Sequence, residues 1–275
     1  MDLTQALQIV GQTDPGRVRA PHNEDSIVTC PASGLVVLAD GMGGYNAGEV
    51  ASNLASSVLA QRLNTLMSDM AKNLSREQAK ALVKQRLGAE IKHANTLIFD
   101  QANQDLSCQG MGTTLVMGLF YDNFLAAAHV GDSRLYRLRR DRLEALTRDH
   151  SLLQEQLDSG MITPDEARYS SNKNLVTRAL GVDMAVNADI QIFEVEVGDL
   201  YLFCTDGLND LVEDEDIRLT LFGLRSNPPL AAQQLIRMAN DSGGRDNVSV
   251  VLVRVMQDFS VTRGLWTQLT GWLRA

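Results

Sequence analysis

The hydrophobic positions of this chain repeat with two different periods. Short apolar runs typical of strands cover residues 7–13, 26–30, 34–40, 112–120, 123–130, 133–139, 190–197, 199–205 and 247–256. Between residues 40 and 70 the period lengthens, and apolar residues recur every three to five positions at Val50, Leu54, Val58, Leu63 and Leu66. That stripe predicts a helix that covers a sheet with its apolar face.

A second helix is expected directly after the first. Ser75 and Gln78 have the spacing of a capping box, which marks a helix start. The apolar residues of this helix are Ala79, Leu82, Val83, Leu87, Ile91, Ala94 and Ile98. Because the two helices are long and adjacent, we expect them to form one antiparallel layer. A third helix is predicted from about Asn227-Pro228 to Asn240.

The strands in the middle of the chain are joined by short connections. Tyr121-Asp122-Asn123 and Gly131-Asp132 leave room only for tight turns, so we expect hairpins and an antiparallel sheet. The order of elements is strands, two helices, strands, a helix and a strand. It predicts an α+β domain in which two antiparallel sheets carry helices on their outer faces.

Two segments differ from this pattern. Residues 149–180 are more polar, with a short helix expected at about 150–159 and a helix start at Thr163-Pro164-Asp165-Glu166. The tail after Asp258 has apolar residues that could share one face of a short helix: Leu265, Trp266, Leu269, Trp272 and Leu273. That helix would pack on its own domain or dock on a partner or a membrane surface.

Composition narrows the class of protein. The 275 residues are 44% hydrophobic and 21% charged, as in an ordinary folded domain, and the net charge of −9 argues against nucleic-acid binding. Three cysteines without CxxC spacing favour a reducing, cytoplasmic compartment. No apolar run approaches the roughly 20 residues of a membrane span, and the start lacks a signal peptide, so membrane contact is not expected. The acidic run 213–216 is interpreted as a solvated helix start.

Carboxylates stand at the ends of three apolar strands. Asp40-Gly41 and Asp206-Gly207 each follow a strand, and Asp246 precedes the last one. If that last strand runs antiparallel to the others, the three acids converge, and they would repel one another unless cations lay between them. A single Asp-Gly pair is more often a turn, so the combination carries the prediction of a hard-metal site. The four histidines, in contrast, show no common metal spacing.

Further motifs accompany these acids in a fixed order. They are Arg19-Ala20-Pro21-His22-Asn23-Glu24-Asp25-Ser26, Asp40-Gly41-Met42-Gly43-Gly44, Gly110-Met111-Gly112-Thr113-Thr114, Val130-Gly131-Asp132-Ser133-Arg134, Asp206-Gly207 and Gly244-Arg245-Asp246-Asn247. From about residue 8 to about 256, the chain resembles the bacterial metal-dependent serine/threonine phosphatases of the protein phosphatase 2C family. The resemblance implies a four-layer αββα sandwich, two antiparallel β-sheets flanked by antiparallel helix pairs. We therefore expect a catalytic domain at 1–257 and a tail at 258–275.

The resemblance also implies a site with two Mn²⁺ or Mg²⁺ ions and a third, weaker one. Asp40 would bridge two ions, Asp206 and Asp246 would bind the first, and the Gly41 carbonyl and Glu24 the second. Asp25 would lie close by, Asp132 with Asp206 would bind the third ion, and Asn247 would support Asp246. For Asp132, the alternative is an ordinary hairpin turn.

Arg19 is the candidate for binding the substrate phosphate, because a guanidinium pairs two phosphoryl oxygens at once. The family has two residues between this arginine and Asn-Glu-Asp, whereas this chain has three, so Arg17 competes for the role. Met42 stands where animal members carry a histidine that protonates the leaving group. Methionine cannot donate a proton, so a water on a metal or the third site would serve instead.

The reaction expected is hydrolysis of phosphoserine and phosphothreonine in proteins, in opposition to a bacterial serine/threonine kinase. A hydroxide shared by two ions would attack the phosphorus in line, since the ions offset the repulsion between two anions. Residues 149–180 correspond to the variable flap beside the site. The alternatives are a catalytically inactive domain that binds phosphoproteins, and a narrow regulatory phosphatase with one small protein substrate.

Overall fold

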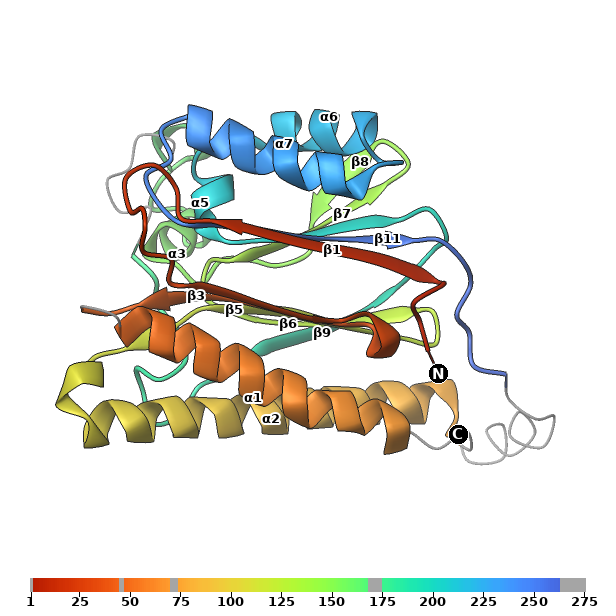
Figure 1. Ribbon diagram of the computed structural model, residues 1–275, viewed down its shortest axis with the longest axis horizontal. Helices are drawn as coiled ribbons and strands as arrows, with labels where there is room; N and C mark the ends of the chain where they lie inside the picture. The colour runs from red at the N-terminus through yellow and green to blue at the C-terminus, as the bar shows by residue number, and fades with distance from the viewer. Residues whose placement is uncertain (1, 45–46, 70–73, 168–174, 263–275) are drawn as a thin grey trace.

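The fold is described by a computed structural model for residues 2–44, 47–69, 74–167 and 175–262. Two antiparallel sheets lie face to face, and helices cover both outer faces (Figure 1). In the described residues, one sheet, here the first sheet, has the order β1 (Leu7–Asp14), β11 (Val248–Val255), β10 (Leu200–Cys204), β7 (Arg134–Arg139), β8 (Arg142–Ala145). The second sheet has the order β2 (Asp25–Cys30), β3 (Leu35–Met42), β5 (Leu115–Tyr121), β6 (Phe124–Val130), β9 (Asp189–Glu194), with β4 (Gly112–Thr113) paired to β3.

The helices form the two outer layers. The second sheet is covered by α1 (Ala47–Asp69) and α2 (Arg76–Gln104), and the first sheet by α6 (Asp214–Gly223) and α7 (Pro228–Asp241) (Figure 1). Three short helices, α3 (Leu152–Asp158), α4 (Pro164–Ala167) and α5 (Asp206–Asn209), complete the α-helices of the described chain. The predicted four-layer αββα architecture is therefore confirmed.

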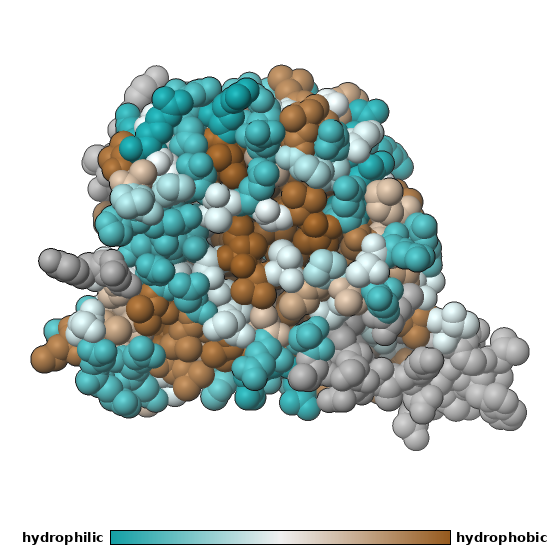
Figure 2. Space-filling view, viewed as in Figure 1, coloured by the Kyte–Doolittle hydropathy of each residue, from teal (hydrophilic) through white to brown (hydrophobic). Residues whose placement is uncertain are grey.

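Among the described residues, three apolar clusters hold the layers together. One lies between the first helix pair and the second sheet and includes Leu59, Leu87 and Met117. Another fills the space between the two sheets, and the last packs the first sheet against α6 and α7. Burial of these side chains is the main stabilising contribution to the sandwich. On the face seen in Figure 2, hydrophobic residues also reach the surface between the helical layers, where the sheet edges lie.

Local signals explain where the helices begin. At α2, the Ser75 side chain accepts the Gln78 N–H at 3.2 Å, and the Gln78 side chain accepts the Ser75 N–H at 2.9 Å. The predicted capping box is thus confirmed. Thr163 and Glu166 make the corresponding pair at α4. The acidic run at 213–216 opens α6 and is exposed, as the pattern predicted.

One predicted hairpin is wrong. β6 and β7 do not pair; β6 lies in the second sheet between β5 and β9, whereas β7 pairs with β10 and β8 in the first. The connection Gly131-Asp132 therefore carries the chain from one sheet to the other. Gly131 adopts φ 104°, a conformation that glycine tolerates best, and this allows the chain to leave the plane of its sheet.

The end of the described chain still contacts the core. Phe259 is buried between the sheets, and its N–H donates to Asn123 Oδ1 at 2.8 Å. The helix predicted for the tail, with Leu265 and Trp266, lies outside the described residues. No helix in the part of the chain that the structure describes is both long and apolar enough to span a bilayer.

Candidate metal centre

The predicted acids meet at one end of the sandwich. β11 runs antiparallel to β10, so Asp246, just before β11, and Asp206, just after β10, lie at the same end of the first sheet. Asp40 stands near the end of β3 in the second sheet, directly opposite Asp25 on β2. The acids therefore converge from two facing sheets, whereas a single sheet rim was the simplest arrangement to expect.

Asp40 has the most negative surroundings of this group. Burial raises its pKa well above the ordinary value, and the charges of Asp25, Asp206 and Asp132 raise it further. Burial likewise raises the pKa of Asp206, with Asp132 and Asp210 as the next causes. Such raised pKa values mean that the folded protein holds these carboxylates at a cost in free energy.

Only one of the two carboxylate oxygens of Asp25 accepts hydrogen bonds. Its Oδ2 accepts hydrogen bonds from Ser249 Oγ at 2.6 Å and Thr205 Oγ1 at 3.1 Å. Burial nevertheless raises the pKa of Asp25 to about 6. Oδ1 of Asp25 and Oδ1 of Asp206 are both buried without any hydrogen-bond partner.

Buried acids with unpartnered oxygens fit a divalent cation. A hard cation such as Mg²⁺ or Mn²⁺ takes oxygen ligands and offsets the repulsion between carboxylates. The donor set contains no sulfur or imidazole, which softer metals would favour. The residues present therefore match the ions that the sequence predicted.

Arg19 lies against two of the remaining acids. Its Nε and Nη2 pair with Asp246 at 2.8 and 3.0 Å, and its Nη1 reaches Glu24 Oε2 at 3.2 Å. Burial raises the pKa of Glu24, while Arg19 opposes this shift. Arg17, the competing candidate, instead pairs with Asp241 at 2.5 Å, and its side chain is 61% exposed. Arg19 thus contacts the acidic group and Arg17 does not.

Gly41 allows the backbone to pass close to the start of α1. A Cβ at this position would lie 2.1 Å from the Gly48 carbonyl oxygen and 2.8 Å from that of Glu24. Only glycine fits such an approach. A Cβ at Gly48 would in turn lie 2.4 Å from Glu24 Oε1, so both glycines shape the position of Glu24.

Asp132 lies on the crossing between the sheets. It is 6% exposed, and burial raises its pKa to about 7, with Asp149 and then Asp210 as further causes. The hairpin-turn interpretation of this residue does not hold, because β6 and β7 are not a hairpin. Its charge acts on both Asp40 and Asp206, so it lies beside the other acids.

Asn247 organises the loop that carries Arg19. Its Oδ1 accepts the Glu24 N–H at 2.8 Å, and its Nδ2 donates to the carbonyls of Pro15 and His22 at 3.0 and 2.8 Å. It contacts Asp246 through its backbone, whose N–H donates to Asp246 Oδ1 at 2.8 Å. The side chain therefore supports Glu24 more than Asp246.

Three residues at this site were not anticipated: Thr205, Ser249 and Gly48. A signal existed for two of them. Ser249 interrupts the otherwise apolar run Val248–Val253, and Thr205 stands between an apolar strand and Asp206. A polar residue inside a buried strand requires a hydrogen-bond partner, and here that partner is Asp25.

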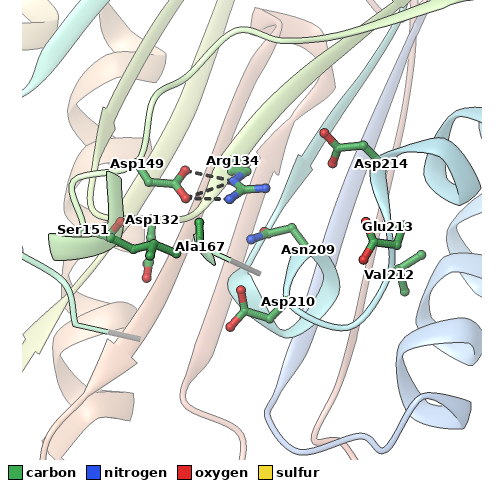
Figure 3. Close-up of a pocket in the computed structure, with 11 residues that line it drawn as sticks. Asp132, Arg134, Asp149, Ser151, Ala167, Asn209, Asp210, Val212, Glu213 and Asp214 are labelled. Atoms are coloured by element: carbon green, nitrogen blue, oxygen red, sulfur yellow. Dashed lines mark hydrogen bonds and ion pairs between the residues drawn. The ribbon is translucent and has the colours of Figure 1, made fainter. Parts of the chain in front are cut away.

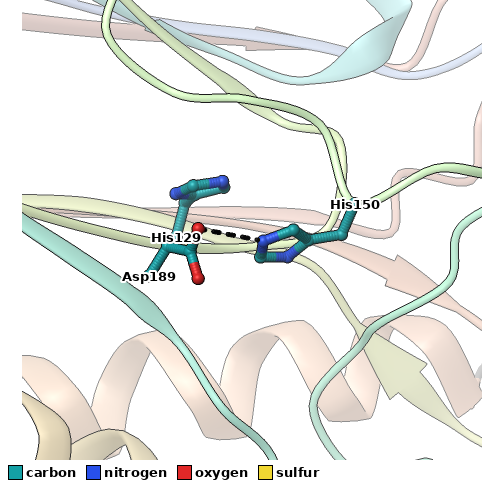
Figure 4. Close-up of side chains that lie close together, drawn as sticks. All are labelled: His129, His150 and Asp189. Carbon is teal, nitrogen blue, oxygen red and sulfur yellow. Dashed lines mark ion pairs between the residues drawn. The ribbon is translucent and has the colours of Figure 1, made fainter. Parts of the chain in front are cut away.

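A second cluster of potential metal ligands contains two histidines and an aspartate, and His129 lies just before the Gly131 crossing. His129 and His150 stack with their ring centroids 4.6 Å apart, and Asp189 faces His150 (Figure 4). In the described residues, this is the one group of three side chains whose potential ligand atoms all lie within 4.8 Å of one another. The acids of the main site need not be so tight, because two ions and their waters separate the ligands.

The histidine cluster is better explained as packing than as a metal site. The ring planes are only 20° apart, so one ion could not lie in both planes. His129 Nε2 donates to the Arg148 carbonyl at 2.8 Å, and His150 Nδ1 accepts the Gly131 N–H at 3.2 Å. Burial lowers the pKa of both histidines. The pair therefore anchors the start of the 149–180 segment to the sheet crossing.

Known proteins have a similar fold and a similar sequence. Residues 17–240 match the family described as Protein phosphatase 2C. The serine/threonine protein phosphatase PstP of Mycobacterium tuberculosis is 38% identical over 264 residues, which are 95% of this chain and 48% of that protein. The chain thus spans about half the length of this relative. The phosphatase stp of Listeria monocytogenes is 36% identical over 245 residues, covering 88% of this chain and 93% of the relative.

Solved structures agree with the sequence matches. The catalytic domain of PstP, determined in complex with 2 manganese ions, superposes with a TM-score of 0.77 at 38% identity, covering 92% of this chain and 99% of that one. Stp1 from Staphylococcus aureus gives a TM-score of 0.81 at 32% identity, covering 94% and 98%. The resemblance expected from the motifs is confirmed, and the chain belongs to the protein phosphatase 2C family.

Proposed function

We propose that this protein hydrolyses phosphoserine and phosphothreonine in proteins with the help of Mn²⁺ or Mg²⁺. The observation that carries the proposal is the group of buried carboxylates with two unpartnered oxygens, on Asp25 and Asp206. Mutually repelling acids are unfavourable in a folded domain unless they bind cations. This also argues against the inactive, phosphoprotein-binding alternative, which has no use for them.

The proposed ligands are the acids that the structure brings together at the candidate metal centre. The charges of both Asp25 and Asp206 act on Asp40, which supports Asp40 as the proposed bridging ligand. The other proposed ligands are Asp246, Glu24 and the Gly41 carbonyl, with Asp132 and Asp206 for a third ion. When bound, the ions would lower the pKa of water and shield the phosphoryl oxygens. Asn247 would keep Glu24 in place through its hydrogen bond to the Glu24 N–H.

Arg19 is proposed to bind the substrate phosphate. Its side chain is 45% exposed while its guanidinium touches Asp246 and Glu24, so it stands at the border between solvent and the acids. A phosphate that arrives there can pair two oxygens with the guanidinium and be oriented toward the carboxylate group. The substrates would be proteins phosphorylated by a serine/threonine kinase, and the three free cysteines fit the predicted cytoplasmic location.

The proposal is tested by phosphate release from a phosphothreonine peptide. We expect release with Mn²⁺ or Mg²⁺ and none in excess EDTA. Asp206→Asn should reduce turnover by more than about 100-fold, since one ligand charge is lost. Full activity in EDTA, or turnover of the variant within a few-fold of wild type, would contradict the proposal.

Folding of the variant is checked separately. Asp206 is buried among like charges, so the asparagine should not destabilise the metal-free protein. Thermal unfolding in EDTA is therefore expected at or above the wild-type temperature. The rise in unfolding temperature on adding Mn²⁺ should be smaller than in wild type, which would report on binding without reference to activity.

A further inference from the structure

His150 contacts Gly131 twice, at the crossing between the two sheets. Its backbone N–H donates to the Gly131 carbonyl at 2.9 Å, and its ring Nδ1 accepts the Gly131 N–H at 3.2 Å. These two groups of Gly131 lie on either side of its torsion φ, which is 104°. Because glycine by itself can adopt many values of φ, the two bonds restrict the conformation in which the chain enters Asp132.

The residue before His150 in the chain holds the other side of Asp132. Asp149 and Asp132 line the same cleft, whose volume is about 430 Å³ (Figure 3). The Asp149 carboxylate accepts hydrogen bonds from the Arg134 guanidinium at 2.7, 2.9 and 3.2 Å. The dipeptide Asp149-His150 therefore fixes the chain both before Asp132, at Gly131, and after it, at Arg134.

The contact with Gly131 requires one tautomer of the His150 ring. The Gly131 N–H can only donate, so Nδ1 offers its lone pair, and a neutral ring then carries its hydrogen on Nε2. Nε2 lies 3.6 Å from Asp189 Oδ2, which faces this hydrogen (Figure 4). Burial lowers the pKa of His150, and His129 and Arg178 lower it further, which favours the neutral ring.

We propose that His150 is a positioning residue for the metal centre: its Nδ1 holds the Gly131 N–H and thereby fixes the position of the Asp132 carboxylate. This inference rests on the proposed function, in which Asp132 is a ligand of the third ion. A glycine cannot fix the residue that follows it, so contacts from another part of the chain have to do so. Loss of a residue that supports a ligand without touching the ion usually weakens metal binding by about 10- to 100-fold.

Two variants of similar shape test the ring nitrogen. Asparagine has its Oδ1 where histidine has Nδ1, whereas leucine has the same branching and no acceptor. His150→Leu should raise the Mn²⁺ concentration needed for half-maximal phosphate release by about 10-fold or more, and His150→Asn by less than about threefold. The Mn²⁺-dependent rise in unfolding temperature should give the same order of the two variants, without reference to activity.

His129→Phe is the matched control. Phenylalanine can still stack on the His150 ring but cannot donate to the Arg148 carbonyl, so a buried hydrogen bond is lost while the contact with Gly131 remains. This variant should lose stability and keep the wild-type Mn²⁺ requirement. An equal Mn²⁺ requirement in His150→Leu and His150→Asn would overturn the inference, and so would an equal rise in His129→Phe and His150→Leu.

A measurement on the wild type decides the inference even if His150→Leu does not fold. Nitrogen-15 NMR of the His150 ring should show the hydrogen on Nε2, and a hydrogen on Nδ1 would overturn the inference. If the wild type binds Mn²⁺ but releases no phosphate from the peptide, the proposed function fails. The unfolding temperatures of the two His150 variants in Mn²⁺ then still decide whether His150 positions the metal centre.

Discussion

Ser249 Oγ donates a hydrogen bond of 2.6 Å to Asp25 Oδ2, across the space between the two sheets. Ser249 lies on β11 in the first sheet and Asp25 on β2 in the second. Thr205, directly after β10, donates to the same oxygen at 3.1 Å. One oxygen of Asp25 is therefore held by the opposite sheet, and the other is left without a partner at the candidate metal centre. The packing of the sheets thus sets the position of this acid.

Thr205→Val should weaken the site without removing a proposed ligand. Valine has the shape of threonine but lacks the hydroxyl, which donates to Asp25 and accepts the Ser249 N–H at 3.0 Å. Leaving a buried N–H unpartnered costs about 1–3 kcal/mol of unfolding free energy. Loss of a supporting hydrogen bond should also weaken Mn²⁺ binding by about 10- to 100-fold. Denaturant unfolding and Mn²⁺ titration of phosphatase activity measure the two effects.

Thr205→Ser is the matched control, because it keeps the hydroxyl. It should retain the Mn²⁺ requirement of the wild type even if the lost methyl group lowers stability. If the serine variant binds Mn²⁺ as weakly as the valine variant, the hydrogen bond is not what supports Asp25.

Arg19→Ala and Arg17→Ala should have different consequences. Arg19 touches Asp246 and Glu24, whereas the Arg17 side chain pairs with Asp241. Loss of a guanidinium that pairs with phosphate should lower kcat/KM for a phosphothreonine peptide by about 100-fold, from charge-assisted hydrogen bonds of about 1.5–3 kcal/mol. Arg17→Ala should change kcat/KM by less than about threefold, as for an exposed ion pair. The reverse order of effects would assign the phosphate to Arg17.

The metal-free protein should lose stability as the pH rises. Burial raises the pKa of Asp25 to about 6 and of Asp132 to about 7, above the value of 3.8 expected in the unfolded chain. At a pH between 3.8 and the folded-state pKa, each of these carboxyl groups keeps a proton in the folded state that it has released in the unfolded state. The free energy of unfolding therefore falls as the pH rises from about 4 to about 7. Unfolding by urea in EDTA at several pH values measures this slope.

Asp132→Asn isolates the carboxylate contribution to that slope. The fall in unfolding free energy between pH 4 and 7 should be shallower in this variant, since asparagine does not titrate. The comparison is necessary because burial lowers the pKa of His129 and His150, and these groups raise stability with pH instead. An unchanged slope in the variant would show that Asp132 does not carry a raised pKa.

Much of the fold could be predicted from local patterns. The strands and the three long helices were recognised because side-chain periods of two and about 3.6 depend only on neighbouring residues. The edge strand β8 was missed, since most of its residues are exposed and no apolar run marks it. The Gly131-Asp132 crossing was taken for a hairpin, because a two-residue connection has the same length whether the chain turns back or changes sheet.

The candidate ligands could be identified from the sequence, because it shows the residue types and the order of the motifs directly. Their convergence was predicted too, but the strand pattern did not show that it joins two sheets: Asp40 and Asp206 come from different sheets and meet only because those sheets stack. The same holds for Thr205 and Ser249, whose partner is 180 and 224 positions away. Hydrogen bonds and charge act over a few ångströms of space, and the distance between two residues in space is set by packing rather than by their separation along the chain.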